Sequence, residues 1–368
     1  MTIKEINSLI SEWAPKELAW ERDNIGLQVG SYEKPVHKIL AALDVTIDVV
    51  DECISKNIDL LIVHHPLIFN PIKSINSNDR IGQLIFKLIE NRISVIAAHT
   101  NLDFTKYGVS YTLAQKLELK NIKILKPTES HFKKIAVFVP SDYTEKVAES
   151  MANAGAGVIG NYDYCSFRTS GIGTFKGGKE TKPFIGSPGE FEKVEEIKLE
   201  MIVPNWKLSD VTSALRRSHP YEEPAFDIYP LEIVSEYYGA GAIGTFEEAL
   251  TQKKFLQHAK EKLNAENIKY VEGSQDKIKT VAVCGGSGSN LIPDAIAAKA
   301  DAFVTGDVGY HSFIEANGII LLVDAGHFET EVAIVDSIVN YLKNKFISLK
   351  ENIQISATTQ IKNPIQNI

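Results

Sequence analysis

The sequence predicts an α/β protein in which two similar βαβ-type lobes form one core, with an inserted ferredoxin-like α+β domain between them in the chain. Three observations lead to this fold class. Apolar runs of strand length alternate with helical patterns in both end regions of the 368-residue chain. Polar residues follow several of these runs where each strand ends. The middle of the chain lacks such polar strand ends. The predicted domains are residues 1–127, 128–234 and 235–368.

The amino-terminal lobe alternates strands with helices. Apolar side chains at helical spacing over residues 3–13, followed by Pro15, predict an amphipathic helix. The segment 20–30 mixes charges with two glycines and, taken alone, is typical of a surface loop leading into a strand. The pattern then predicts a strand at 38–44, a helix at 47–57, a strand from 60, a helix at 82–91 and a strand at 93–98. This alternation indicates a parallel sheet with right-handed crossovers.

Histidines mark the ends of two of these strands. One apolar run contains His64 and His65 followed by Pro66. Because proline cannot continue a central ladder, both imidazoles fall at the carboxyl end of the strand, where open α/β sheets bind ligands. A lone buried histidine is usually a core residue, but a pair at a strand end favours a site. The next strand ends before His99 and Asp103, which we expect on the same rim if the strands are neighbours.

The middle of the chain has the order of a ferredoxin-like domain. The pattern predicts a strand at 133–140, a helix at 144–155, glycine-rich turns at 170–175, a half-exposed strand at 197–204, a helix at 208–218 and an extended segment at 219–230. His219 is flanked by Pro220 and has no neighbouring cluster of histidine or aspartate. We therefore favour a structural or interface role for His219 over a role as a ligand.

The carboxyl-terminal lobe repeats the pattern of the first. It predicts a strand at 279–284, a turn at 285–289, a helix at 292–299, strands at 302–305 and 318–323, and a helix from His327 to about residue 345. Its strand ends correspond to those of the first lobe, Cys284 to Asp44, Thr305 to His65 and His327 to His99. We infer a diverged internal duplication, and expect a pocket between two such lobes.

His327 and Glu331 are four residues apart at the start of a predicted helix, so they project from one face. Together with His64, His65 and Asp103 they give three imidazoles and two carboxylates on one rim, without a thiolate. This set exceeds the four ligands of a structural zinc site and suits two metal ions roughly 3.5–4 Å apart, with Glu331 as the bridge. The alternative is five unrelated polar residues at strand ends.

These ligand types restrict the choice of metal ion but do not identify it. Imidazole and carboxylate suit zinc, iron, manganese and cobalt alike. The expected cofactors are two divalent metal ions, with zinc preferred and iron or manganese as alternatives. Such a centre attracts phosphate and lowers the pKa of bound water.

The turn Gly285-Gly286-Ser287-Gly288 follows a strand and could hold a phosphate with its backbone N–H groups. It lacks a complete G-x-G-x-x-G and a Walker lysine, so a plain tight turn is an equally good interpretation.

The overall composition limits location and partners. A net charge of −8 and a pI near 5.7 argue against nucleic acid as a partner, since no basic stripe is available to neutralise phosphates. Three cysteines far apart suggest neither a disulfide framework nor a thiolate zinc site. The amino terminus has no apolar signal region, and no stretch approaches 18 apolar residues. We expect a cytoplasmic protein with no membrane partner.

Four segments together resemble one protein family over essentially the whole chain. They are His64-His65-Pro66, residues 98–103 around His99, residues 326–331 around His327, and Asp23-Asn24-Ile25-Gly26-Leu27. The combination is similar to the Nif-three-like dinuclear-metal family, which often carries the label GTP cyclohydrolase 1 type 2. The middle domain, with Phe184-Ile185-Gly186 and the segment 219–224, resembles the CutA-like, PII-like module of longer members.

The resemblance implies a dinuclear centre held by His64, His65, Asp103, His327 and Glu331, with His99 close by, in a toroidal homohexamer. At such a centre we expect His99 to be catalytic, as a proton shuttle. The family label implies hydrolytic opening of the imidazole ring of GTP to give formate and dihydroneopterin triphosphate. No guanine-reading motif is evident in the sequence, so the expected partner is a small nucleotide or phosphorylated substrate. Two other functions stay open: a metal-dependent phosphoesterase, and a non-enzymatic metal-binding regulatory or scaffold protein.

Overall fold

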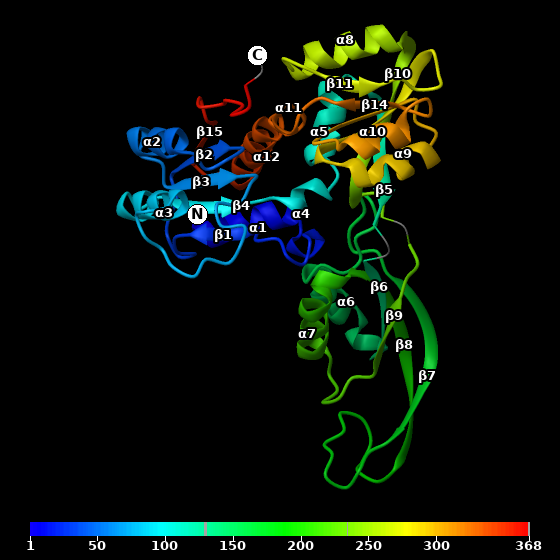
Figure 1. The fold of residues 1–368 in the computed structure, drawn as a ribbon. Coiled ribbons are helices and arrows are strands. Elements are labelled where there is room, and N and C mark those ends of the chain that lie inside the picture. The colour runs from blue at the N-terminus through cyan, green and yellow to red at the C-terminus, as the bar shows by residue number, and fades with distance from the viewer. Residues whose placement is uncertain (129–130, 234, 367–368) are drawn as a thin grey trace. The chain divides into compact units, whose positions relative to one another are not determined.

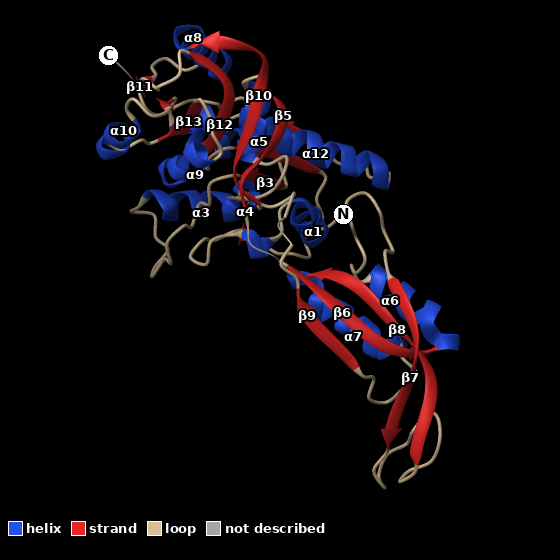
Figure 2. Ribbon diagram, turned by 90° about the vertical axis from the view of Figure 1, so that its right-hand side faces the viewer, coloured by secondary structure: helices blue, strands red, loops and turns tan. Residues whose placement is uncertain are grey.

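The computed structural model describes residues 1–128, 131–233 and 235–366, and the chain is a mixed α/β protein with several sheets (Figures 1 and 2). It divides into two compact units, which are described separately below. One unit combines Met1–Pro127 with Glu236–Ile368, and the other is Thr128–Ser235. The predicted domain boundary at residue 234 lies outside the described residues.

The first unit contains a five-stranded sheet in the order β1-β4-β3-β2-β15. Its strands are β1 (Gly26–Val29), β2 (Lys38–Ala42), β3 (Leu60–Val63), β4 (Ser94–Ala97) and β15 (Gln354–Ala357). All neighbours are parallel except β1, which runs antiparallel to β4. Alternate residues of the strands pack against α1 (Ile3–Trp13) and α12 (Ile334–Leu349) on one face, and against α2 (Ile47–Lys56) and α3 (Arg80–Glu90) on the other. Because both faces are covered, the central strands read as continuous apolar runs.

The same unit contains a six-stranded sheet in the order β11-β14-β13-β12-β10-β5. Its strands are β5 (Lys120–Pro127), β10 (Gly239–Thr251), β11 (Lys269–Val271), β12 (Lys277–Ser287), β13 (Ala302–Gly306) and β14 (Leu321–Asp324). Strands β12, β13 and β14 are parallel, and the other neighbours are antiparallel. Helices α5 (Val109–Lys116) and α8 (Gln252–Leu263) pack on one face, and α9 (Ile292–Ala297) and α10 (Tyr310–Ala316) on the other.

The two sheets share an order of elements. The series α1–β1–β2–α2–β3–α3–β4 of the first sheet has the same sequence of helices and strands as α8–β11–β12–α9–β13–α10–β14 of the second. In each series the three strands that follow the short first one, β2, β3 and β4 or β12, β13 and β14, are parallel neighbours, and the short first strand lies antiparallel beside the last of them. Two short helices follow the strand ends that matter below: α4 (Thr100–Asp103) follows β4, and α11 (His327–Glu331) follows β14.

The second unit contains a four-stranded antiparallel sheet in the order β7-β8-β6-β9. Along the chain its elements are β6 (Phe132–Pro140), α6 (Thr144–Asn153), β7 (Phe167–Lys176), β8 (Phe191–Pro204), α7 (Leu208–Ser218) and β9 (Phe226–Pro230). Both helices pack on one face of the sheet around a core that includes Val137, Leu199 and Val211. Short 3-10 turns complete the two units at Lys16–Leu18, Ser141–Tyr143, Asn205–Lys207 and Ser289–Leu291.

Three details of the predicted elements were wrong. The segment 170–175, expected as glycine-rich turns, lies within strand β7, because an edge strand that pairs only with β8 tolerates glycine. The predicted turn at 285–289 begins later, since β12 continues to Ser287. The single helix expected from His327 is split into α11 and α12. Among the described residues, none of the helices has both the length and the apolar character needed to cross a bilayer.

Candidate metal centre

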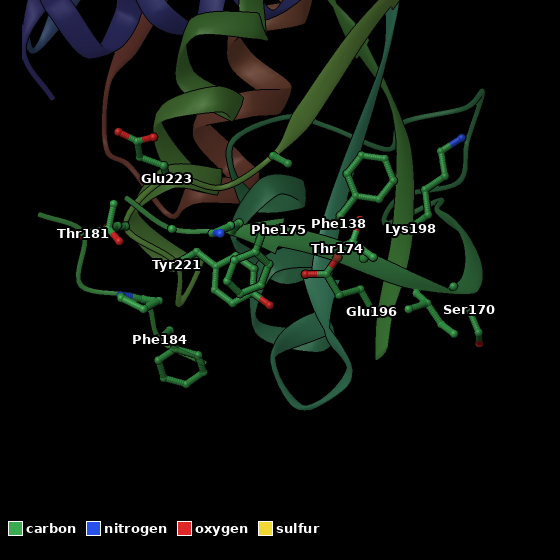
Figure 3. Close-up of a pocket in the computed structure, with 18 of the residues that line it drawn as sticks. Phe138, Ser170, Thr174, Phe175, Thr181, Phe184, Glu196, Lys198, Tyr221 and Glu223 are labelled. Carbon is green, nitrogen blue, oxygen red and sulfur yellow. The ribbon is translucent and has the colours of Figure 1, made fainter. Parts of the chain in front are cut away.

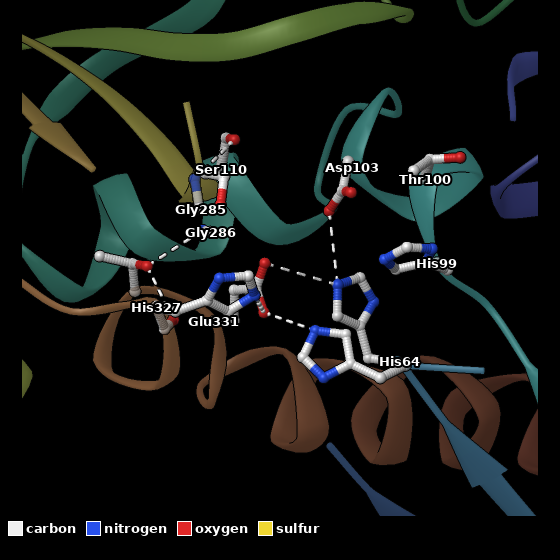
Figure 4. Close-up of polar contacts among 12 residues, drawn as sticks. His64, His99, Thr100, Asp103, Ser110, Gly285, Gly286, His327 and Glu331 are labelled. Atoms are coloured by element: carbon white, nitrogen blue, oxygen red, sulfur yellow. Dashed lines mark hydrogen bonds and ion pairs between the residues drawn. The ribbon is translucent and has the colours of Figure 1, made fainter. Parts of the chain in front are cut away.

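Six polar side chains, two each from the end of β3, from α4 and from α11, meet in the first unit (Figure 4). His64 and His65 come directly after β3, and their backbone N–H groups still donate to the carbonyls of Ala42 and Leu43 beside the end of β2. Pro66 follows at once and cannot donate to the ladder. His99 and Asp103 lie at the two ends of α4, and His327 and Glu331 at the two ends of α11. The structure therefore brings together all six residues that the sequence pointed to.

His64 is fully buried and has one ring nitrogen committed to the backbone. Its Nδ1 lies 2.8 Å from the carbonyl oxygen of Ala98, which can only accept, so Nδ1 carries the proton. The lone pair of Nε2 then points toward Asp103 Oδ1 at 3.5 Å and Glu331 Oε1 at 3.8 Å. Both distances are longer than a good hydrogen bond, so Nε2 is available as a ligand atom.

His65 and His327 converge on one oxygen of Glu331. Their Nε2 atoms lie 2.9 Å and 3.0 Å from Glu331 Oε2. Each ring is held by a second carboxylate on its other nitrogen: Nδ1 of His65 donates to Asp44 at 2.8 Å, and Nδ1 of His327 donates to Asp307 at 2.6 Å. A carboxylate behind a histidine fixes the ring and makes its free nitrogen more basic, as is typical of metal ligands.

The donor atoms form overlapping groups that could each hold a metal ion. His65, His327 and Glu331 form one group, His64, Asp103 and Glu331 a second, and His64, His65 and His99 a third, with the donor atoms of each group within 4.8 Å of one another. His64 Nε2, Asp103 Oδ1 and Glu331 Oε2 are buried and have no hydrogen-bond partner of good geometry. Since buried polar atoms are normally paired, these residues fit a bound cation.

The close approach of imidazoles and carboxylates shifts the pKa values of the site residues. Burial lowers the pKa of His65, but the hydrogen bonds to Asp44 and Glu331 outweigh it and raise the pKa to about 10. The hydrogen bond to Glu331 raises the pKa of His327 to about 9. Burial raises the pKa of Asp103 to about 6. Burial also acts to raise the pKa of Glu331, but the surrounding imidazoles, His327 first, hold it well below its usual range.

His99 is oriented by a buried aspartate from the segment 20–30. Nδ1 of His99 donates to Asp23 Oδ1 at 2.9 Å, and Asp23 Oδ2 accepts from the backbone N–H of Thr100 at 3.0 Å and from its hydroxyl at 2.5 Å. Burial raises the pKa of Asp23, yet the bonds from His99 and Thr100 prevail and lower it to about 2. The first half of the segment is a loop that leads into β1, as expected, and Asp23 anchors this loop to the site with a side chain that is 1% exposed.

A cavity of about 230 Å³ opens beside these residues. Its lining includes His65, His99, Asp103, His327 and Glu331, together with the aromatic side chains Trp20 and Phe104 and the polar side chains Ser110, Ser287 and Asn290. None of the described lining residues is a lysine or an arginine.

The glycine-rich segment after β12 supports the site instead of offering free N–H groups. The backbone N–H groups of Gly286 and Gly288 donate to the hydroxyls of Thr330 and Thr305, at 3.0 Å and 2.9 Å. Gly286 has a φ of +61°, and a Cβ there would lie 2.2 Å from Glu331 Oε1. Glycine is thus required by both the backbone conformation and the position of the carboxylate.

We expect Gly286→Ala to weaken metal binding. The new Cβ must displace the Glu331 carboxylate, and the left-handed backbone adds a cost of about 1–2 kcal/mol to folding. Metal titration and thermal unfolding of the variant measure the two effects. Gly309→Ala is the control, because a Cβ at Gly309 meets nothing within 4 Å. Equal metal affinity in both variants would contradict the assigned position of the carboxylate.

Sequence reasoning gave no role to Asp44 and Asp307, the carboxylates behind His65 and His327. Asp307 directly follows β13, and Asp44 lies two residues after the end of β2. Each of these strands is the parallel neighbour of the strand that precedes the histidine. A search for acidic residues at the ends of neighbouring parallel strands would have found them.

Asp307→Asn is expected to lower metal affinity about 10–100-fold, because an amide holds the His327 ring less strongly and makes Nε2 less basic. Competition with a chelator of known affinity measures the change. Asp301→Asn serves as a control: Asp301 accepts only backbone N–H groups, from Lys279 and Thr280. An unchanged affinity in Asp307→Asn would exclude a supporting role for that carboxylate.

Comparison with known proteins agrees with this centre and fold. The family model described as Duf34/NIF3 (NGG1p interacting factor 3) matches residues 1–364. A relative from Halalkalibacterium halodurans named GTP cyclohydrolase 1 type 2 homolog is 43% identical over 322 residues, which cover 87% of this chain and 86% of that protein. A Bacillus subtilis relative of the same name is 42% identical, with 89% of each chain covered.

Solved structures give the same result. A crystal structure of a Bacillus cereus protein related to NIF3 superposes with a TM-score of 0.87 and 40% identity, covering 100% of this chain and 99% of that one. A Staphylococcus aureus protein superposes with a TM-score of 0.80 and 32% identity over the same shares. On this evidence of sequence and structure, the chain belongs to the Duf34/NIF3 family.

Proposed function

We propose that the protein is a hydrolase whose centre holds two divalent metal ions, with Glu331 shared between them. One observation carries the proposal: Glu331 belongs to two donor groups at once, with His65 and His327 on the side of Oε2, and with His64 and Asp103 on the side of Oε1. A buried carboxylate between two such groups is the arrangement expected of a bridge. Zinc is the preferred metal, with iron and manganese as alternatives.

When bound, such a pair of ions polarises a substrate oxygen and lowers the pKa of water. The chain's own residues then have separate tasks. His64, His65 and His327 present Nε2 because their Nδ1 atoms are committed to a carbonyl or a carboxylate. His99 lines the cavity with its Nδ1 held by Asp23, so its Nε2 is the group placed to accept or return a proton during hydrolysis.

The proposed substrate is GTP, and the proposed reaction is hydrolytic opening of its imidazole ring to formate and dihydroneopterin triphosphate. Two features support it. The curated relatives carry the name GTP cyclohydrolase 1 type 2 homolog. Trp20 and Phe104 lie in T-shaped contact with ring centroids 6.1 Å apart in the cavity wall, and an aromatic wall suits a purine.

Phosphoester hydrolysis is the second candidate, favoured by the charge of the cavity. A triphosphate is usually held by lysine or arginine, and the described lining contains neither. Metal ions would then be the main source of positive charge, which is enough for one phosphate bridging both ions.

Turnover measurements separate these candidates. Protein loaded with zinc, iron or manganese is incubated with GTP and with a panel of phosphomonoesters, and formate and inorganic phosphate are measured. Formate production that is lost in His99→Ala at unchanged metal content supports ring opening. Phosphate release without formate supports the second candidate. If two metals bind and neither product forms, the hydrolase proposal fails and a non-enzymatic metal-binding role replaces it.

We also propose two finer features of the architecture, a pair of similar lobes in the first unit and an inserted ferredoxin-like domain. The matching order of elements in the two sheets supports two similar lobes related by duplication. The β-α-β-β-α-β order of Thr128–Ser235 supports a ferredoxin-like insert of the CutA-like, PII-like kind. The homohexamer and the cytoplasmic location stay predictions.

A further inference from the structure

The unit Thr128–Ser235 has a cavity of its own, of about 580 Å³ (Figure 3). Residues that line it from β6 and β8, such as Phe138, Glu196 and Lys198, alternate with Val137, Val139 and Leu199, which pack in the helix-covered core. The cavity therefore lies on the sheet face opposite the helices. Aromatic side chains form much of its wall: Phe138, Phe175, Phe184 and Tyr221.

Glu196 is a buried carboxylate in this wall. It lies in the middle of the central strand β8, with Gly171 of β7 as its register partner, and is 8% exposed. A Cβ at Gly173 would lie 2.0 Å from Glu196 Oε2, so glycine at that position makes room for the carboxylate along β7. Lys198, two residues along the same strand, pairs with Glu200 at 3.4 Å, and no ion pair to Glu196 is formed within the described chain.

Tyr221 gives the cavity a second polar group. Its hydroxyl is buried and has no hydrogen-bond partner of good geometry. Burial first, and then the hydrogen bond to Glu196 and the charge of that carboxylate, raise the pKa of Tyr221, so the hydroxyl keeps its proton at neutral pH. Its ring lies 6.1 Å from that of Phe175 and 6.2 Å from that of Phe184, centroid to centroid.

His219 holds this tyrosine in place. Its Nδ1 accepts the backbone N–H of Tyr221 at 3.1 Å, and its Nε2 donates to the Phe138 carbonyl at 3.0 Å. Both ring nitrogens are therefore used for structure, in agreement with the role expected for His219. Burial lowers the pKa of His219, which favours this neutral form.

We propose that this cavity binds a small organic cation, an ammonium, amidine or guanidinium group attached to an aromatic body, with the cation on Glu196 and the body among Phe175, Phe184 and Tyr221. A carboxylate that is 8% exposed and forms no ion pair with any described residue is costly to hold in its charged form, and a ligand cation lowers that cost. Aromatic faces add attraction for the cation and cover the apolar part of the ligand. The described lining has three carboxylates, with Glu222 and Glu223 beside Glu196, against the two lysines Lys176 and Lys198, so one negative charge is in excess.

The test uses three probes that differ mainly in charge: 2-phenylethylamine, 2-phenylethanol and 3-phenylpropionate. Binding to the full-length chain is measured by calorimetry after metal removal, so that the amine cannot ligate a metal. We expect the amine to bind at least about tenfold more tightly than the alcohol, the factor that one charged hydrogen bond supplies, and the acid to bind most weakly. Equal binding of all three probes, or tighter binding of the acid, would overturn the proposal.

Variants locate the site. Glu196→Gln is expected to lower amine affinity at least about tenfold while leaving the affinity for the alcohol unchanged. Gly173→Ala should also weaken amine binding, because its Cβ displaces the carboxylate without removing a charge. Glu195→Gln is the matched control: it removes the same charge from the exposed neighbouring position, on the opposite face of β8. If the control loses as much affinity as Glu196→Gln, the amine does not bind at Glu196.

Discussion

Glu331→Gln is expected to remove metal from both positions of the centre. The substitution keeps the shape of a side chain that is 4% exposed but replaces one of the two oxygens that face the histidines by an NH2 group. An amide nitrogen cannot ligate a cation, and the lost negative charge leaves three imidazoles beside Asp103 alone. Changing a residue that only supports a ligand costs about 10–100-fold in metal affinity, so we expect a loss of more than about 100-fold here.

Metal content per chain, measured by elemental analysis after dialysis against a fixed low metal concentration, gives the result. Glu315→Gln is the control, because Glu315 is an exposed acid on α10 of the same unit. Thermal unfolding in chelator shows whether the metal-free variant keeps its fold. A variant that loses one metal and retains the other at native affinity would contradict the bridging role of Glu331 and leave it as a ligand of a single ion.

The strand ends that carry this centre were predictable because they lie in doubly covered parallel strands. Burial of both faces makes β3 and β4 continuous apolar runs, and Pro66 marks where the first one ends. Strands β5, β10 and β15 were not predicted. In β5, for example, exposed lysines separate the apolar residues of a short edge strand, and its pairing partner β10 lies more than a hundred residues further along the chain. Local pattern contains no information about such a partner.

In the site, too, some residues are predictable from local sequence pattern and others are placed only by the folded topology. His327 and Glu331 were predictable because helical spacing alone places them on one face. The position of Asp307 behind His327 depends on which strands are neighbours in the sheet, which only the folded topology decides. Gly286 is a third case. Only glycine fits there because a Cβ would lie 2.2 Å from Glu331 Oε1, and the two residues are far apart in sequence.

Metal binding is expected to become much tighter as the pH rises from 7 to about 9. In the metal-free protein the pKa of His327 is raised to about 9 and that of His65 to about 10, so both imidazoles are protonated at pH 7. A metal ion needs the neutral ring and must displace these protons. Each displaced proton makes the apparent affinity rise about tenfold per pH unit below the pKa of its histidine, and two together give up to about 100-fold per unit.

Two measurements test this dependence. Competition titrations against a chelator of known pH-dependent affinity, at pH 7, 8 and 9, give the slope. Calorimetry at pH 7.5 in buffers of different ionisation enthalpy counts the protons released, and we expect about two, one each from His65 and His327. Asp44→Asn should release fewer, because without that carboxylate the pKa of His65 returns toward its ordinary value. His311→Gln, which changes an exposed histidine on α10, should leave the count unchanged. An affinity that does not vary with pH would mean that His65 and His327 are neutral before the metal binds, and would contradict the prediction.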